Sequence, residues 1–317
     1  MQSHHRIFVA GHTGLAGSAI VRTLRKHGFA NLLMRTRAEL NLLDHAGVSD
    51  FFRQQRPDYV FLAAAKVGGI LANSTYPTEF LLQNLTIQTN VIQAAYEFEV
   101  KKLLFLGSSC IYPRDCPQPI REEYLLSGRL EATNEAYAIA KIAGLKLCAS
   151  YNRQFGTDFL CAMPTNLYGP GDNYDLRNSH VLPALIRKFH EARERNQNKV
   201  VVWGTGAALR EFLYSDDLGE ALVFLMQRCN AEQVGEAINV GTGEDISIRD
   251  LAHRIAELVG FKGEVVFDVD KPDGTPRKLL DVSRMRALGW RHRVALEEGL
   301  TRTYAAFTRS LYAACAA

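Results

Sequence analysis

The sequence lacks the cysteine spacings of a disulfide framework or a zinc site. Its 317 residues contain six cysteines, with no Cys-x-x-Cys pair and no Cys/His cluster. Scattered cysteines in a chain of this length are typical of a reducing compartment, so we expect a cytoplasmic protein with mostly inert thiols and no bound metal. The cysteines are Cys110, Cys116, Cys148, Cys161, Cys229 and Cys315.

Other features are also missing, and each absence excludes a class of protein. No apolar run is long enough to cross a bilayer, and the N-terminus has no apolar signal segment, so we expect no membrane contact. Lys and Arg number 37 against 34 for Asp and Glu, and no long basic run suggests nucleic-acid binding. The length allows one or two domains with a large core.

A glycine-rich turn between a strand and a helix is the first positive feature. Residues 6–10 are an apolar, β-branched run that predicts a buried strand, and residues 18–26 have helical periodicity. Gly11, Gly14 and Gly17 stand between them in the spacing G-x-x-G-x-x-G. Gly11 permits a tight turn, Gly14 lets the backbone approach a pyrophosphate, and Gly17 lets the helix pack closely against the strand. The helix N-terminus offers free N–H groups to the phosphates. The segment therefore predicts a dinucleotide site.

The second predicted strand favours one cofactor over the other. Residues 31–34 are apolar, and Arg35 and Arg37 follow, where an NAD site usually has an acid. Because guanidinium groups suit a 2′-phosphate, NADP(H) is favoured over NAD(H). The alternative is a solvated basic end of a loop.

Strands and helices then alternate along the first half of the chain. Strands are predicted at 59–63, 102–106 and 158–163, and long helices at 79–96 and 135–155. This alternation predicts the α/β class, with a doubly wound parallel sheet whose strand C-termini share one crevice.

The pattern changes after about residue 170. Short strands at 199–202 and 264–267 alternate with helices in the remaining chain. We therefore expect residues 1–170 to form an NADP-binding Rossmann domain, to which residues 211–245 return. Residues 171–317 would mainly form a smaller α/β substrate domain.

A tyrosine and a lysine form the candidate proton-transfer pair. Tyr137 and Lys141 lie four residues apart on one face of a predicted helix, and Ser108 and Ser109 follow the strand at 102–106. A nearby cation lowers the pKa of a phenol from about 10, and a serine can hold the substrate oxygen. Such a set suits a carbonyl/alcohol couple. The alternative is an aromatic ring packed under a lysine stem.

Several motifs together carry a resemblance to a known family. They are the Gly11–Gly17 loop, Ser-Ser-Cys-Ile-Tyr-Pro at 108–113, Tyr137-x-x-x-Lys141, Pro-Thr-Asn-Leu-Tyr-Gly-Pro at 164–170 and Lys-Pro-Asp-Gly-Thr-Pro-Arg-Lys at 271–278. Over nearly its whole length the chain resembles the GDP-L-fucose synthases, which are extended short-chain dehydrogenase/reductases. One departure is Thr13, where related chains can carry arginine.

The resemblance implies a homodimer that uses NADP(H) and takes GDP-4-keto-6-deoxy-D-mannose as substrate. The sugar would be epimerised at C3 and C5, after which the C4 ketone would be reduced. For catalysis, the resemblance implies Cys110 as base, His180 as acid, Ser108 to orient the ketone, Tyr137 to protonate its oxygen, and Lys141 to bind the nicotinamide ribose and tune the phenol. The alternative for Cys110 is a structural role as a buried thiol, and the alternative for His180 is a structural role at the start of a helix.

The same resemblance implies the binding residues. Cofactor contacts are expected from Gly11, His12, Thr13, Gly14, Leu15, Ala16, Gly17, Arg35, Arg37, Leu40, Asn41, Leu42, Leu106, Gly107, Ser109, Lys141, Pro164, Thr165, Asn166, Leu167 and His180. Substrate contacts are expected from Lys188, Trp203, Arg210 and Asp273.

Two other functions compete with this one. The first is another NAD(P)-dependent nucleotide-sugar enzyme, such as a UDP-hexose 4-epimerase or a 4,6-dehydratase. A dehydratase usually follows its serine with an Asp-Glu pair, whereas Ser109 and Cys110 stand here. The second is a non-catalytic NADP-binding regulator, against which the intact catalytic set argues.

Overall fold

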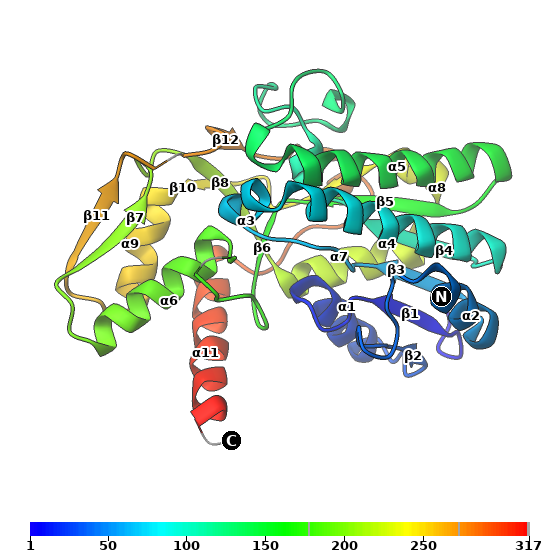
Figure 1. The fold of residues 1–317 in the computed structure, drawn as a ribbon, viewed down its shortest axis with the longest axis horizontal. Helices are drawn as coiled ribbons and strands as arrows, with labels where there is room; N and C mark the ends of the chain where they lie inside the picture. The colour runs from blue at the N-terminus through cyan, green and yellow to red at the C-terminus, as the bar shows by residue number, and fades with distance from the viewer. Residues whose placement is uncertain (177, 272, 316–317) are drawn as a thin grey trace.

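The centre of the molecule is a six-stranded sheet in which every strand runs parallel to its neighbours (Figure 1). The computed structural model describes residues 1–176, 178–271 and 273–315, so Pro272 of the Lys271–Lys278 motif lies outside the described residues. The strand order is β2-β1-β3-β4-β5-β9, which confirms the predicted doubly wound α/β class. The strands are β1 (Ile7–Ala10), β2 (Leu32–Leu33), β3 (Tyr59–Leu62), β4 (Lys102–Leu106), β5 (Phe159–Pro164) and β9 (Ile238–Val240).

Both faces of this sheet are buried. Successive side chains of a strand point to opposite faces, and in β1 Ile7 and Val9 enter one apolar cluster while Phe8 and Ala10 enter the other. The strands β3, β4 and β5 divide their side chains in the same way. Burial on both faces explains why these strands are continuous apolar runs in the sequence.

Helices cover the two faces (Figure 1). One face packs against α1 (Leu15–Lys26) and α7 (Ser215–Arg228), and the other against α2 (His45–Gln55), α4 (Pro77–Glu97) and α5 (Glu135–Phe155). The helices α1 and α7 approach closely, because a Cβ added to Gly219 would meet the Thr23 hydroxyl oxygen at 2.5 Å. Two short helices, α8 (Ala231–Val234) and α10 (Ser283–Ala287), add Val234 and Met285 to the same core.

The second half of the chain builds a separate apolar cluster beside the sheet. Its four-stranded sheet has the order β10-β8-β12, with β6 also paired to β8, and β7 pairs with β11 in parallel. The strands are β6 (Asn166–Tyr168), β7 (Lys199–Trp203), β8 (Leu209–Tyr214), β10 (Asp245–Ser247), β11 (Glu264–Asp268) and β12 (Arg277–Lys278). Three helices pack around this cluster: α6 (Val181–Glu194), α9 (Ile248–Val259) and α11 (Leu296–Cys315).

One strand was not predicted from the sequence. Residues 166–168 form β6, because β8 offers them a partner edge. By contrast, the strand β9 lies within residues 211–245, which were expected to return to the first domain, and it joins the main sheet beside β5. Within the described residues, no helix is long and apolar enough to cross a membrane, and no three His, Cys, Asp or Glu side chains are placed to hold a metal ion.

Short connections complete the surroundings of the sheet edge. The helix α3 (Ile70–Thr75) follows β3, and three 3₁₀ turns lie between β4 and α5. They are η1 (Ser109–Ile111), η2 (Glu122–Tyr124) and η3 (Ala132–Asn134).

Candidate active site

The glycine loop after β1 has the geometry of a phosphate site. Gly11 has a φ of +84°, which favours glycine, and a Cβ there would meet the Ala64 backbone nitrogen at 2.7 Å. A Cβ on Gly17 would overlap the Gly11 carbonyl oxygen. The helix α1 begins at Leu15 without a side chain capping its first N–H groups. These groups are therefore available to a phosphate, and the cradle fits a dinucleotide pyrophosphate.

The two arginines predicted to read a 2′-phosphate lie just after β2. The Arg35 guanidinium lies 5.7 Å from the centre of the Phe51 ring, which fixes its direction, and Arg37 is exposed. Nearby, Glu39 accepts hydrogen bonds from the backbone and hydroxyl of Thr36, and these bonds lower its pKa. The loop thus carries one anchored cation, one exposed cation and an ionised carboxylate.

The side chains of other residues predicted to contact the cofactor are occupied by contacts within the protein. Leu40 is buried in the core, and the Leu42 carbonyl accepts a hydrogen bond from the Asn90 amide at 3.0 Å. After β5, the side chains of Thr165 and Asn166 donate to the Glu211 carbonyl at 3.2 and 2.8 Å. These contacts hold the loops in place at the carboxyl ends of the strands.

Lys141 is almost fully buried beside β4. It is 3% exposed, and its ammonium donates to the Leu106 carbonyl at 2.7 Å and lies 4.7 Å from the centre of the Phe105 ring. Burial disfavours the charged form and lowers the pKa of Lys141 to about 7. A lysine of this kind changes its charge near neutral pH when a ligand alters its surroundings.

Tyr137 lies one helical turn before Lys141, as predicted. The Lys141 ammonium is 5.9 Å from the centre of the Tyr137 ring. The sequence led us to expect a lysine that lowers the pKa of this phenol, and that expectation is wrong. Burial raises the pKa of Tyr137, the charge of Cys110 adds to the rise, and only a hydrogen bond with Ser108 opposes it.

Ser108 and Cys110 begin the 3₁₀ turn η1 directly after β4. The Ser108 hydroxyl accepts a hydrogen bond from the Cys110 backbone N–H at 3.2 Å and caps the turn. The Cys110 sulfur is half-buried and accepts from two donors, the Asn134 amide and the Lys278 ammonium, each at 3.5 Å. The thiol therefore faces a cation and a polar amide in addition to Tyr137.

His180 is the N-cap residue of α6. Its ring keeps contact with solvent, yet the surrounding protein atoms and then the charge of Lys278 lower its pKa. Lys278 thus acts electrostatically on both Cys110 and His180.

The residues predicted to bind the substrate gather on β7, β8 and α6. Trp203 is 52% exposed, and the ammonium groups of Lys188 and Lys271 lie 5.8 and 5.6 Å from its ring centre. The Arg210 guanidinium donates to the Asp273 carbonyl at 3.2 Å, and burial lowers the pKa of Arg210. An exposed indole with several cations suits a nucleoside diphosphate.

The Asp273 carboxylate joins two loops. Its two oxygens accept from the backbone N–H and the hydroxyl of Thr205, both at 2.8 Å. Its expected contact with the substrate stays a prediction.

The structure adds three residues that the sequence did not single out as functional: Asn134, Lys271 and Lys278. Both lysines stand in the Lys271–Lys278 motif, which was the available signal. Asn134 precedes α5, and its carboxamide oxygen is buried without a hydrogen-bond partner among the residues that the structure describes. That oxygen is available to a ligand group.

Comparisons with known proteins agree with this geometry. The model of the "NAD dependent epimerase/dehydratase family" matches residues 7–241. The chain is 58% identical to "GDP-L-fucose synthase" of Escherichia coli (strain K12), covering 95% of this chain and 96% of that protein. It is also 58% identical to "GDP-L-fucose synthase 1" of Arabidopsis thaliana, over 94% of this chain and 92% of that one.

A solved structure shows the same fold with a cofactor in place. The GDP-L-fucose synthetase of Naegleria fowleri bound to NADP superimposes with a TM-score of 0.90 at 30% identity, covering 98% of this chain and 96% of that one. These relatives confirm the resemblance drawn from the motifs, and NADP(H) is the cofactor. By the family model and by these relatives, the chain belongs to the NAD dependent epimerase/dehydratase family.

Proposed function

We propose that this enzyme converts GDP-4-keto-6-deoxy-D-mannose into GDP-L-fucose, by epimerisation at C3 and C5 and reduction of the ketone at C4. The observation that carries the proposal is that the Cys110 thiol follows Ser108 in the turn η1, contacts the Asn134 amide and the Lys278 ammonium at 3.5 Å each, and acts electrostatically on Tyr137. A tyrosine paired with a lysine is found in carbonyl reductases in general. A thiol beside that pair adds a group that can remove a proton from a carbon next to a ketone. Relatives named as GDP-L-fucose synthases, 58% identical to this chain, support this substrate over those of the competing epimerases and dehydratases.

The first chemistry uses the acidity of the keto sugar. The C4 ketone acidifies the hydrogens on C3 and C5, so loss of a proton gives an enolate. Cys110, as thiolate, takes the proton and becomes a thiol, and His180, as imidazolium, returns a proton to the opposite face of the carbon. Exchange with solvent resets both groups before the second carbon reacts.

The second chemistry fixes the new stereocentres by reduction. NADPH, when bound, supplies the hydride for C4. The Ser108 hydroxyl holds the ketone oxygen, and Tyr137, which is protonated at neutral pH because its pKa is raised, donates the proton. Lys141 binds the nicotinamide ribose.

We also assign the two halves of the molecule to the two ligands. Residues 1–170, with 211–245, bind NADP(H) through the residues predicted from the motifs. Residues 171–317 mainly bind the GDP-sugar, with Trp203 facing the nucleotide and Lys188 and Arg210 facing the diphosphate. The exposed indole and its neighbouring cations support this assignment.

A cytoplasmic homodimer is the form that we propose for the protein, without nucleic-acid or membrane partners. The outer faces of α4 and α5 expose Leu82, Ile139 and Phe155, which are 61%, 44% and 47% exposed. These apolar side chains support self-association through the two helices. The five cysteines whose side chains the structure describes are all free thiols, which fits a reducing compartment.

The test is a single incubation with GDP-4-keto-6-deoxy-D-mannose and NADPH, followed by NMR of the sugar product. GDP-L-fucose should form with one equivalent of NADPH oxidised. A product reduced at C4 but unchanged at C3 and C5, or no NADPH oxidation, would contradict the proposal.

A further inference from the structure

Lys278 lies in the candidate active site, although no role in the reaction proposed above falls to it. Its ammonium donates to the Cys110 sulfur at 3.5 Å, across 168 positions of sequence. Among the described residues it forms no ion pair with a carboxylate. Its positive charge is therefore left uncompensated by protein and is directed at the sulfur.

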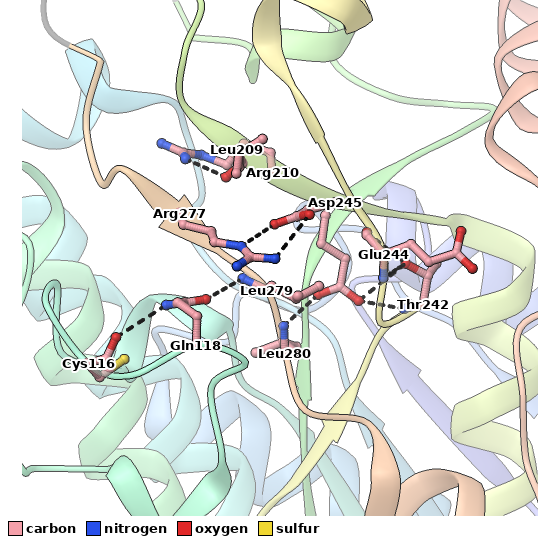
Figure 2. A network of polar contacts seen from close by, with 11 residues as sticks. Cys116, Gln118, Leu209, Arg210, Thr242, Glu244, Asp245, Arg277, Leu279 and Leu280 are labelled. Carbon is pink, nitrogen blue, oxygen red and sulfur yellow. Dashed lines mark hydrogen bonds and ion pairs between the residues drawn. The ribbon is translucent and has the colours of Figure 1, made fainter.

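The position of Lys278 is fixed by the backbone on both sides of it. The strand β12 pairs in parallel with β8, which places Lys278 opposite Arg210. Figure 2 shows Arg277 reaching Asp245, an ion pair of 2.6 Å that holds the start of this short strand. The Leu280 backbone N–H donates to the buried Glu211 carboxylate at 2.9 Å.

The same strand is joined to the loop that follows Cys110. Gln118 accepts a hydrogen bond from the Leu279 backbone N–H at 2.9 Å (Figure 2). The Ile120 backbone N–H donates to the Leu279 carbonyl at 2.7 Å, and the Asp281 N–H donates to the Ile120 carbonyl at 2.8 Å. Because one stretch of backbone carries the thiol and also binds the strand of the lysine, the distance between the two groups is built into the fold.

We propose that Lys278 is a positioning residue for epimerisation, which holds the Cys110 sulfur as a thiolate through its adjacent ammonium, assisted by the Asn134 amide. A thiolate accepts strong hydrogen bonds from both donors, whereas a neutral thiol is a weak acceptor. The thiolate then takes a proton from carbon and becomes a thiol, the ketone becomes an enolate, and solvent later removes the proton from sulfur. This inference rests on the proposed function for the identity of the carbon acid only.

The other charged groups around the sulfur do not replace Lys278. Arg210 and Tyr137 interact electrostatically with Cys110, and Arg210 also faces Glu131 and the Asp273 loop, which share its charge. The charge of Lys278 also acts on His180 and on the second thiol of this region, Cys116, and it favours a lower pKa for both groups. Lys278 is the cation of this group within hydrogen-bond distance of the sulfur.

The test measures the thiol without substrate or cofactor. The ligand-free protein is treated with iodoacetamide at pH 7 and at pH 9.5, and mass spectrometry follows the peptide that contains Cys110, separately from that of Cys116. In Lys278→Met, alkylation of Cys110 at pH 7 should slow about tenfold, because the variant lacks the ammonium that contacts and stabilises the sulfur anion. At pH 9.5 the two proteins should react alike.

Three further variants separate charge from structure. Lys278→Arg keeps the cation and should stay within about threefold of the starting protein, whereas Lys278→Gln keeps a donor without charge and should behave like Lys278→Met. Lys262→Met removes an exposed lysine elsewhere and should change nothing. Equal alkylation at pH 7 in the starting protein and in Lys278→Gln, with both folded by circular dichroism, would overturn the proposal.

The consequence for the reaction is measured separately. In D₂O with the keto sugar and without NADPH, Lys278→Met should exchange the C3 and C5 hydrogens about tenfold more slowly than the starting protein. If the starting protein exchanges neither hydrogen, the proposed function fails while the alkylation result still decides the role of Lys278. If it exchanges both and Lys278→Met matches its rate, the lysine has no part in epimerisation.

Discussion

Tyr137 shows how burial at a single residue decides a catalytic role. The neighbouring lysine was expected to lower the pKa of the phenol, but its ammonium is directed to the Leu106 carbonyl, and burial dominates both groups. A phenol whose pKa is raised keeps its proton at neutral pH. This is the form needed by a residue that must give a proton to the ketone oxygen.

Removal of that hydroxyl is the first prediction. Tyr137→Phe keeps the ring and its edge contact with Phe80, whose ring centre is 6.4 Å away, so the fold and NADPH binding should be unchanged. Ketone reduction should slow by about a hundredfold or more, because the proton donor is lost. Stopped-flow NADPH oxidation measures the rate and fluorescence titration measures binding. Normal turnover would remove Tyr137 from the mechanism.

Lys141 gives the second prediction, which concerns stability and pH. Its pKa is lowered to about 7 in the fold, against 10.5 in the unfolded chain. Between these two values the unfolded chain binds more protons than the folded protein, so the free energy of unfolding rises with pH. From pH 7 to pH 9 this one group adds about 2 kcal/mol.

Lys141→Met removes the group and should remove that part of the pH dependence. Urea unfolding of the ligand-free protein at pH 7 and pH 9 measures it, with Lys262→Met as a control that keeps the slope of the starting protein. The same rise from pH 7 to pH 9 in Lys141→Met would show that other groups are responsible.

At the scale of single elements, we propose that the loop after β2 sets the preference between NADPH and NADH. Arg35 is held over Phe51, whereas Arg37 is exposed and able to move toward a ligand. A charge-assisted hydrogen bond to a 2′-phosphate contributes about 1.5–3 kcal/mol, which corresponds to a preference of about tenfold or more for NADPH over NADH.

The third prediction therefore concerns Arg37→Ala. The variant should lose most of the preference by binding NADPH more weakly, while NADH binding changes little. Isothermal titration with both dinucleotides measures it, and Arg228→Ala at the end of α7 is the matched control. Equal affinities for NADPH and NADH in the starting protein would contradict the reading of this loop.

The elements also show why some of the fold followed from the sequence and some did not. The strand at 102–106 and the helix at 135–155 were predicted within their observed bounds, because each has its own periodicity. The strands β6 and β12 are only three and two residues long and exist because β8 offers them an edge. Short segments of this kind carry no local signal.

The same distinction holds for the site. Tyr137 and Lys141 could be paired from sequence because one helix carries both. The contact of Lys278 with Cys110, in contrast, depends on β12, β8 and the 116–120 loop meeting in space. Likewise, the engagement of the Asp273 carboxylate by Thr205 could not be anticipated, since it joins loops 68 positions apart.

On the scale of the whole molecule, the site exists only where the two halves of the chain meet. Cys110 comes from the end of a central strand, His180 from the start of α6, and Lys278 from the small sheet. In the mechanism that we propose, the base and the acid would therefore approach the sugar from different parts of the fold. A proton could then leave one face of a carbon and return to the other.

The last prediction separates epimerisation from reduction. In D₂O without NADPH, the starting protein should exchange the C3 and C5 hydrogens of GDP-4-keto-6-deoxy-D-mannose, as followed by NMR. Cys110→Ala has no thiol to accept the proton, so exchange should fall by about a hundredfold. His180→Gln keeps the base but lacks the acid, so enolates should be reprotonated on the wrong face or before both centres have reacted.

The pH dependence of that exchange follows from the same two groups. Since the pKa of His180 is lowered below its ordinary value, its imidazolium fraction falls as pH rises, so the reprotonation that depends on His180 should slow as pH rises. With NADPH present, His180→Gln should form a GDP-6-deoxyhexose other than GDP-L-fucose, because reduction through Tyr137 remains intact. Undiminished exchange in both variants would return Cys110 and His180 to purely structural roles and leave the site a simple ketone reductase.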